Sequence, residues 1–218
     1  MTKTHKGVFI NNGHAPTFQL SDTGSIMTGL PCFRREKFRL HQFHFHFRHG
    51  EHDGTEHEME GVKYAAELHM VHYNVKYGSF VKAVDKYDGL AVVAVLMEVI
   101  LNHGTHCSFN PFDIVPKYHN FFYYKGSLTT PGCYQSVHWL IFKEKIFIKP
   151  ETLKVFRDMR TKHGEPISKR GNIRPVQPLF MRHLLINFFP KKPKKEFSTY
   201  PCMDLRATTE FKLDFPYV

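Results

Sequence analysis

Several features are missing from this chain of 218 residues, and each absence excludes a class of protein. No apolar run approaches the roughly 20 residues that a membrane-spanning helix needs, so no membrane span is expected. The four cysteines form no CxxC pair, which argues against a cysteine zinc cluster and against a thioredoxin-type redox motif. The histidine motifs HExxH and HxHxDH are also absent, which argues against zincin proteases and some other metallohydrolases.

Acidic residues are scarce relative to basic ones: the chain has 20 Asp and Glu against 30 Lys and Arg, a net charge of +10. Residues 143–195 hold 15 of the basic and 4 of the acidic side chains. Such a region is typical of a solvated basic face, and also of proteins that bind an acidic polymer or matrix. Because no zinc-finger spacing or RNA-binding aromatic motif accompanies the charge, no nucleic-acid partner is expected.

The apolar segments are short and rich in aromatic and β-branched residues, which indicates a sheet-centred protein. Strands are expected at 38–47, 64–74, 90–101 and 136–148. The run 92–101 is nearly all apolar, which predicts a strand buried on both faces. A helix is expected only at 150–161, where Leu153, Phe156 and Met159 follow Pro150 at three-residue spacing. With 42% apolar residues, we expect a single domain over residues 1–218.

Histidine is unusually abundant: the chain has 16, and eight of them lie between His41 and His72. Side chains alternate along a strand, so the expected strand at 38–47 has an aromatic face and a polar face. The aromatic face holds Phe43, Phe45 and Phe47, and the polar face holds Gln42, His44 and His46. In the next expected strand, Glu67, His69 and Val71 share one face. If the two strands are neighbours, His69 completes a cluster of three imidazoles.

Three neutral nitrogen ligands with one open position are typical of catalytic rather than structural zinc. A ligating histidine needs an acceptor for its other ring N–H, and Gln42 and Glu67 each precede a histidine by two residues on the same face. An HxH pair alone is a weak signal, because hydrogen-bonded core histidines give the same pattern. The two strands together favour the metal site.

Seven motifs along the chain resemble the α-class carbonic anhydrases, and they run in family order over almost the whole sequence. The motifs are NNGH at 11–14, QFHFH at 42–46, GTEH at 54–57, YAAELHMVH at 64–72, DGLAV at 88–92, GSLTTP at 126–131 and NIRPVQPL at 172–179. The resemblance implies a mostly β fold (α+β by count) with a ten-stranded, largely antiparallel central sheet and short surface helices. It implies reversible hydration of carbon dioxide to bicarbonate and a proton by a hydroxide on zinc, with His44, His46 and His69 as the ligands.

The resemblance also assigns roles around the metal. Thr129 would accept a hydrogen bond from the hydroxide and donate its own to Glu56, and the backbone carbonyl of Asn172 would support His46. His14 would be the proton shuttle, with Asn12 and Thr17 holding the intervening waters. The expected apolar wall for the substrate consists of Val71, Val92, Leu128, Val137 and Trp139, with Thr130 near the bicarbonate. The alternative for each wall residue is plain core packing. His57, Arg174 and His72 are expected to be structural.

The chain departs from the family pattern near its beginning. Family members carry a sizeable segment before the NNGH motif, so we expect this domain to be incomplete at its N-terminus. Cys133 matches a position that, in secreted and membrane-anchored members, pairs with a cysteine of that segment. The resemblance therefore implies an extracellular protein with Cys133 unpaired. A buried free cysteine in a cytoplasmic protein is the alternative, and pairing with Cys32, Cys107 or Cys202 stays open.

Two further expectations follow from the resemblance. Aromatic and heterocyclic sulfonamides are expected to inhibit the protein, because their anionic nitrogen would replace the hydroxide. A monomer is expected as well. The competing interpretation is a catalytically impaired relative of the carbonic anhydrases that serves as a binding or biomineral-matrix protein through its basic face. The retention of all three zinc histidines, with Glu56, Thr129 and His14, argues against that interpretation.

Overall fold

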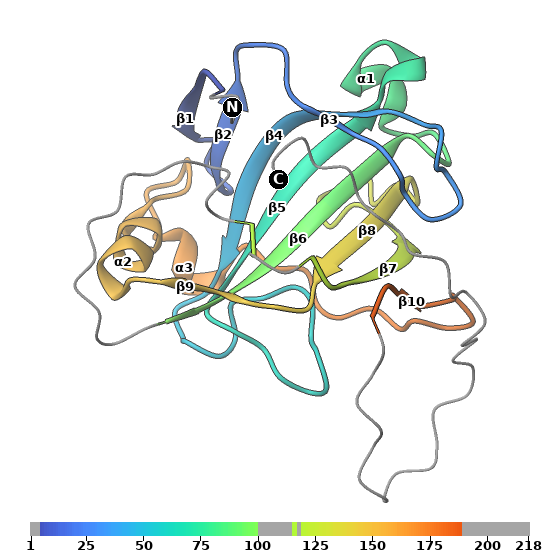
Figure 1. Cartoon of the computed structure of the whole chain (residues 1–218). Coiled ribbons are helices and arrows are strands. Elements are labelled where there is room, and N and C mark those ends of the chain that lie inside the picture. The colour runs from blue at the N-terminus through green and yellow to red at the C-terminus, as the bar shows by residue number, and fades with distance from the viewer. Residues whose placement is uncertain (1–4, 100–114, 117–118, 189–218) are drawn as a thin grey trace, which may run out of the picture.

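The computed structural model describes residues 5–99, 115–116 and 119–188 (Figure 1). Ten strands form one sheet, in which eight follow the order β1-β2-β4-β5-β6-β8-β7-β10, while β3 pairs with β4 and β9 with β6. The strands are β1 (Gly7–Asn11), β2 (Pro16–Leu20), β3 (Ile26–Met27), β4 (Phe38–Phe47), β5 (Ala66–Asn74), β6 (Leu90–Val99), β7 (Phe121–Gly126), β8 (Val137–Phe142), β9 (Ile146–Ile148) and β10 (Leu185–Ile186). All pairings are antiparallel except β6–β8 and β6–β9, which confirms the expected sheet.

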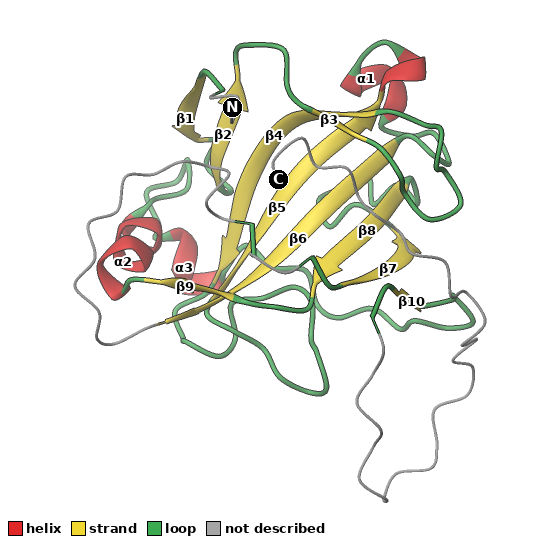
Figure 2. Cartoon of the chain, in the orientation of Figure 1, coloured by secondary structure: helices red, strands yellow, loops and turns green. Residues whose placement is uncertain are grey.

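Within these described ranges the helices are few, short and peripheral (Figure 2). They are η1 (Val75–Tyr77), α1 (Phe80–Ala83), α2 (Pro150–Asp158) and α3 (Ile167–Arg170). The predicted helix at 150–161 ends earlier, at Asp158, because Met159 adopts an extended backbone and Arg160 forms an isolated bridge with Pro166. Pro150 stands at the first helical turn, where its missing N–H costs nothing.

Most of the expected strands match the structure. The strand β4 has the predicted bounds, β5 begins at Ala66 rather than at residue 64, and β6 agrees up to Val99, beyond which the prediction lies outside the described residues. The single strand predicted at 136–148 is wrong. It is two strands, because β8 pairs with the first half of β6 and β9 with its second half, and the charged residues Lys143–Lys145 make the connection.

The aromatic face of β4 forms the main core. Phe43, Phe45 and Phe47 are each at most 2% exposed, and α2 covers this face with Leu153 and Phe156. Fully burying each phenylalanine contributes about 1.5–3 kcal/mol, so this face holds the sheet and α2 together. The strand β6 is buried on both faces from Leu90 to Met97, as its apolar run predicts.

A β-bulge in β4 keeps one face of this strand apolar along its whole length. The register of β4 against β5 shifts between Leu40 and Gln42. Phe38 and Leu40 therefore lie in the same core as Phe43, although strict alternation would place them on opposite faces. Beyond the bulge His44 lies opposite His69, and His46 lies opposite Glu67.

His138 of β8 is buried among the aromatic side chains of the core. Because of this burial, we expect the free energy of unfolding to depend on pH. His138 is 1% exposed, and its Nδ1 lies 2.7 Å from the hydroxyl of Tyr123. Burial, assisted by the charge of Lys125, lowers the pKa of His138 from 6.5 to about 4. The unfolded chain therefore binds a proton between these two pH values that the folded chain does not, so stability falls as the pH drops from 6.5 to 4.

The expected contribution of His138 to this loss is about 3 kcal/mol over the whole interval. Urea unfolding at pH 7 and at pH 4.5 should show it, since the variant His138→Gln has no proton to bind and should lose less stability on acidification. The matched control is His163→Gln, which changes an exposed histidine and should leave the pH dependence as in the parent. Equal slopes for the parent and His138→Gln would refute the assignment.

Candidate metal centre

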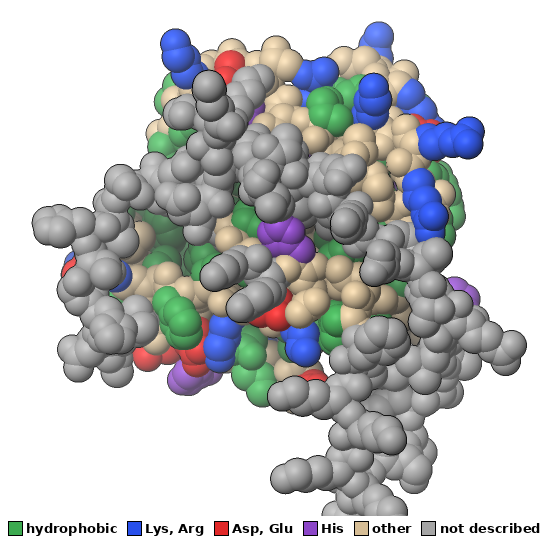
Figure 3. Space-filling model, in the orientation of Figure 1, with side chains coloured by type: hydrophobic (Ala, Val, Ile, Leu, Met, Phe, Trp, Pro, Cys, Tyr) green, Lys and Arg blue, Asp and Glu red, His purple; other side chains and the backbone are tan. Residues whose placement is uncertain are grey.

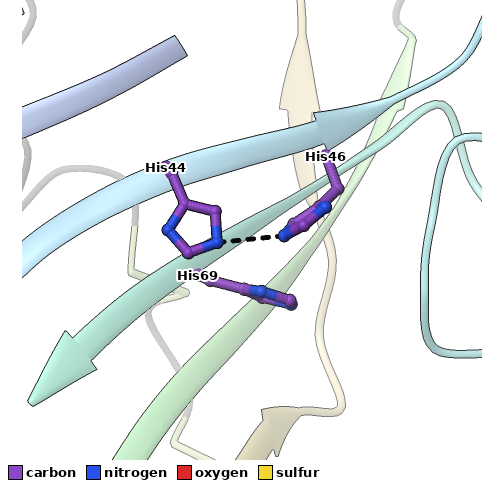
Figure 4. A group of neighbouring side chains, drawn as sticks. All are labelled: His44, His46 and His69. Atoms are coloured by element: carbon purple, nitrogen blue, oxygen red, sulfur yellow. Dashed lines mark hydrogen bonds between the residues drawn. The ribbon is translucent and has the colours of Figure 1, made fainter. Parts of the chain in front are cut away.

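Three histidines from two neighbouring strands point toward one another on the face of the sheet opposite the aromatic core (Figure 4). His44 and His46 come from β4 and His69 from β5, and one ring nitrogen of each lies within 4.8 Å of the others. The Nε2 atoms of His44 and His46 are 3.0 Å apart. Strand alternation puts the first two on one face, and the register of β4 and β5 adds the third.

The second ring nitrogen of each histidine is held by an oxygen that can only accept. Gln42 Oε1 lies 3.1 Å from His44 Nδ1, and Glu67 Oε1 lies 2.7 Å from His69 Nε2. The backbone carbonyl of Asn172 lies 2.6 Å from His46 Nδ1. Each of these nitrogens must therefore carry the proton. The lone pairs are left on the Nε2 atoms of His44 and His46 and on the Nδ1 atom of His69.

This donor set fits a zinc ion. Two nitrogen lone pairs facing each other at 3.0 Å repel unless a proton or a cation lies between them. Around a tetrahedral zinc with bonds of about 2.0–2.1 Å, neighbouring ligand atoms are about 3.3 Å apart, which is close to the 3.0 Å between the Nε2 atoms of His44 and His46. Burial, with the neighbouring His46 and His69, holds the pKa of His44 well below its usual range, and burial lowers the pKa of His46 to about 4. The imidazoles are therefore in the neutral form that binds metal.

Glu67 joins the metal site to the surrounding loop. Its carboxylate is fully buried and accepts four hydrogen bonds. Oε1 accepts from His69 Nε2 and from His57 Nδ1, at 2.7 and 2.5 Å, and Oε2 accepts from the backbone N–H groups of Glu56 and His57. His57, Glu67 and His69 also lie close enough to hold a metal, but these hydrogen bonds already explain their contact.

His57 is a structural member of this network, as expected. Its Nε2 lies 2.7 Å from the hydroxyl of Tyr124. Burial by itself would lower the pKa of His57, but the adjacent Glu67 carboxylate raises it above the usual value. Tyr124 was not among the predicted site residues. No strand was predicted at Phe121–Gly126, so the alternation that puts Tyr124 on the same side of the sheet as the histidines was missed.

Glu56 is buried beside the histidines, and only one of its carboxylate oxygens is bonded. Oε1 accepts the backbone N–H of Arg174 at 2.7 Å, while Oε2 meets no donor among the described residues. The expected hydrogen bond from Thr129 is not formed within this part of the chain. Thr129 lies in a turn closed by a bond from Leu128 N to Tyr134 O. Arg174 also donates to Ser127 Oγ, at 3.0 Å, in agreement with the structural role expected for it.

The residues expected to form the apolar wall lie together on the histidine side of the sheet. Val71, Val92, Val137 and Trp139 belong to one buried cluster, and Leu128 packs against it. Val92 is the register partner of both Val71 and Trp139. The Trp139 ring lies 4.7 Å from that of His69, and its Nε1 donates to Ser127 O. Thr130 is half-buried in the adjoining turn, where its carbonyl accepts from Cys133 N.

His14 is exposed in the loop between β1 and β2, at the edge of the metal site. It is close enough to His44 to act on it electrostatically, which adds to the lowering of the pKa of His44 after burial and the two other site histidines. Asn12 Oδ1 accepts from the backbone N–H of His14, and Asn12 Nδ2 donates to Thr17 Oγ1 at 3.1 Å. Thr17 is the register partner of His44. Histidine side chains reach the surface near the centre of this face of the molecule (Figure 3).

The remaining sequence predictions concern cysteines and membranes. Cys32 and Cys133 are free thiols, whereas Cys107 and Cys202 lie outside the described residues. His72 is buried and bonds through Nδ1 to the backbone carbonyl of Met70, which agrees with a structural role. Within the described ranges no helix has both the length and the apolar character needed to cross a bilayer.

Comparison with known protein families agrees with the fold and with the donor set. The family model of the eukaryotic-type carbonic anhydrases matches residues 1–107 and 100–188, which is most of the chain. That family carries out the hydration of carbon dioxide and uses zinc, and the histidine cluster found here is the group that could hold the metal. The chain therefore belongs to the eukaryotic-type carbonic anhydrase family.

Proposed function

We propose that this chain catalyses the reversible hydration of carbon dioxide to bicarbonate and a proton, with zinc held by His44, His46 and His69. One observation carries the proposal. Each of the three imidazoles has one nitrogen tied to an acceptor oxygen, and the three remaining nitrogens approach one another. Histidines that only filled the core would not require three separate acceptors that direct their remaining lone pairs toward one point.

The metal would supply a Lewis acid that lowers the pKa of a water to about 7, so that a strong nucleophile exists at neutral pH. The protein contributes orientation. Glu56 is buried beside the histidines, and its Oε2 lies 3.9 Å from His69 Nδ1 with no hydrogen-bond donor among the described residues. We propose that this oxygen is the acceptor that orients the nucleophile through an intervening hydroxyl group. Val71, Val92 and Trp139 supply an apolar surface beside His69 for an apolar substrate.

Regeneration of the nucleophile requires a proton to leave the site, and we assign this transfer to His14. It is exposed to solvent, yet near enough for its charge to act on His44. Asn12 and Thr17 form a hydrogen-bonded pair between His14 and the strand that carries His44, which suits the ordering of waters along the path. Histidine is the side chain best suited to pass protons in both directions at neutral pH.

The direct test is stopped-flow hydration of carbon dioxide by the purified chain with its zinc content measured. We expect about one zinc per chain, loss of activity on removal of the metal with a chelator, recovery on return of zinc, and inhibition by an aromatic sulfonamide. A fully zinc-loaded protein without activity would refute the enzymatic proposal and favour a binding role. A chain that takes up no zinc would refute the assigned ligands.

His14→Ala is expected to lower the maximal rate in weakly buffered solution by about tenfold or more, since intramolecular proton transfer contributes at least that much. Zinc content should not change, and added imidazole buffer should restore much of the rate by carrying the proton from solution. The matched control is His163→Ala, which removes another exposed histidine and should have no effect. Equal loss at all buffer concentrations would contradict a role in proton transfer.

A further inference from the structure

The loop between α3 and β10, orange in Figure 1, contains a turn that presents two large apolar side chains to solvent. The backbone N–H of Arg182 donates to Leu179 O at 3.2 Å, which closes a four-residue turn with Phe180 and Met181 at its centre. Phe180 is 84% exposed and Met181 is 96% exposed, more than any other large apolar residue in the described part of the chain. These two residues form the apolar tip of the loop.

The residues of the apolar tip are not the ones that the turn itself requires. Phe180 has a φ of +52°, in the left-handed region that bulky side chains rarely adopt. Glycine, asparagine and aspartate are the residues that fit such a position in a turn without strain. A chain that only had to reverse its direction here would carry one of them. The exposed phenylalanine therefore has no explanation within the turn, and strained positions of this kind are frequent at binding sites.

Arg182 holds the apolar tip in one position at the end of β7. Its guanidinium donates from Nε to Leu179 O at 2.9 Å, from Nη2 to Pro178 O at 2.6 Å and from Nη1 to Lys125 O at 3.1 Å. The same group lies over the ring of Tyr124, 5.4 Å from its centroid. Because the turn is already ordered, a partner that binds the tip does not have to immobilise a flexible loop, which lowers the entropic cost of binding.

The charge of the surrounding sequence indicates the kind of partner. Val176, Leu179 and Leu184 are also exposed and extend the apolar surface on both sides of the turn. Residues 166–195 contain eight Lys and Arg and no Asp or Glu. Exposed apolar side chains combined with positive charge are complementary to an anionic lipid surface, which offers hydrocarbon to the first and phosphate groups to the second. An acidic polymer would match the charge alone and would leave the apolar tip in water.

We propose that the apolar tip, Phe180 and Met181, inserts into the interface of an anionic phospholipid membrane while basic side chains of the chain contact the headgroups. Hydrocarbon then covers the two side chains that water surrounds in the free protein. The carbonyls of Pro178 and Leu179 are already bonded to Arg182, so this part of the turn loses no essential hydrogen bond to water on entering the interface. Two side chains bury little area, so the attachment is peripheral and reversible. It does not depend on the proposed enzymatic activity.

Sedimentation of the full chain with phospholipid vesicles tests the proposal. Vesicles of phosphatidylcholine mixed with phosphatidylserine should bind the chain at about 0.1 M salt, whereas phosphatidylcholine alone or about 1 M salt should weaken the binding. Phe180→Ser/Met181→Ser should weaken it by at least about tenfold, because two apolar side chains no longer enter the lipid. The matched control is Val81→Ser/Val155→Ser, which changes two exposed apolar residues of α1 and α2 and should bind as the parent does. Circular dichroism checks that each variant is folded.

Fluorescence of Phe180→Trp measures insertion directly. The chain's single tryptophan, Trp139, is buried, so a change on addition of vesicles reports on position 180. We expect a blue shift of the emission and quenching by lipids with brominated acyl chains. Failure of the folded parent to bind anionic vesicles, or equal binding by Phe180→Ser/Met181→Ser, would overturn the proposal. So would heparin binding without vesicle binding, which would indicate an acidic polymer, or an emission already blue-shifted without lipid, which would show that the chain itself covers the tip.

Discussion

Replacement of both His44 and His46 by alanine is expected to remove the bound zinc and to reduce carbon dioxide hydration to the uncatalysed rate. Both residues present a lone pair to the same point, and both have the other nitrogen tied to an acceptor. The double variant leaves only His69, and one imidazole cannot hold the metal that generates the nucleophile. Since His44 is partly exposed and the aromatic core lies on the other face of the sheet, the fold itself should persist.

The matched control for this variant is His49→Ala/His52→Ala. It removes two exposed histidines from the segment that follows β4 and should leave zinc content and activity unchanged. Zinc per chain, measured by elemental analysis after gel filtration, and the stopped-flow rate are the two readouts. Stoichiometric zinc in the folded site variant would show that the metal is bound elsewhere, and full activity would show that these histidines are not needed for the reaction.

Glu67→Ala is expected to be the most damaging single substitution outside the ligands themselves. The buried carboxylate accepts four hydrogen bonds, two of them from His57 Nδ1 and His69 Nε2, so its removal deprives two buried and two partly buried donors of this acceptor. Breaking a buried charged network by deleting one partner costs about 3–5 kcal/mol of stability. The orientation of His69 is lost as well, and affinity for zinc should fall by about 10- to 100-fold.

Urea unfolding and a competitive zinc titration measure these two effects. Glu67→Gln retains one acceptor oxygen and is expected to lose less stability and less zinc affinity than Glu67→Ala. This variant keeps the prediction testable if the alanine variant does not fold. Glu58→Ala is the matched control in the same segment, and because Glu58 is exposed its stability should change by no more than about 0.5 kcal/mol. A Glu67→Ala variant with parental stability and parental zinc affinity would contradict the role assigned to this carboxylate.

The local pattern of the sequence determined much of the candidate metal site. Alternation along β4 separates the histidines from Phe43 and Phe45, because a strand turns successive side chains to opposite faces. The same rule, applied to β5, places Glu67 on the face of His69. Spacing of two residues therefore predicted both the ligands and two of their three supporting acceptors. These are properties of residues close together in the sequence, so they can be found without knowing which distant segments pack against the site.

Contacts between segments that are distant in the sequence could not be predicted from the periodicity of side chains along a strand. The carbonyl that supports His46 belongs to Asn172, 126 residues away, and only the resemblance to a family pointed to it. The N–H that holds Glu56 comes from Arg174, at a separation of 118 residues. The hydrogen bond expected between Thr129 and Glu56 is not formed in the described chain, because side-chain geometry in a loop depends on how that loop closes.

Only the tertiary structure decided the register of the strands and the contacts made by the chain before β1. The bulge between Leu40 and Gln42 changes which residues of β4 face the core, and a one-residue shift is energetically favourable only because a packed apolar face lies behind the strand. Residues 136–148 look like one apolar segment in the sequence. They form two strands because β8 and β9 pair with different halves of β6. The meeting of His5 with Asp22 and Ser25 likewise depends on how the chain before β1 packs on the sheet, since no spacing rule connects these residues.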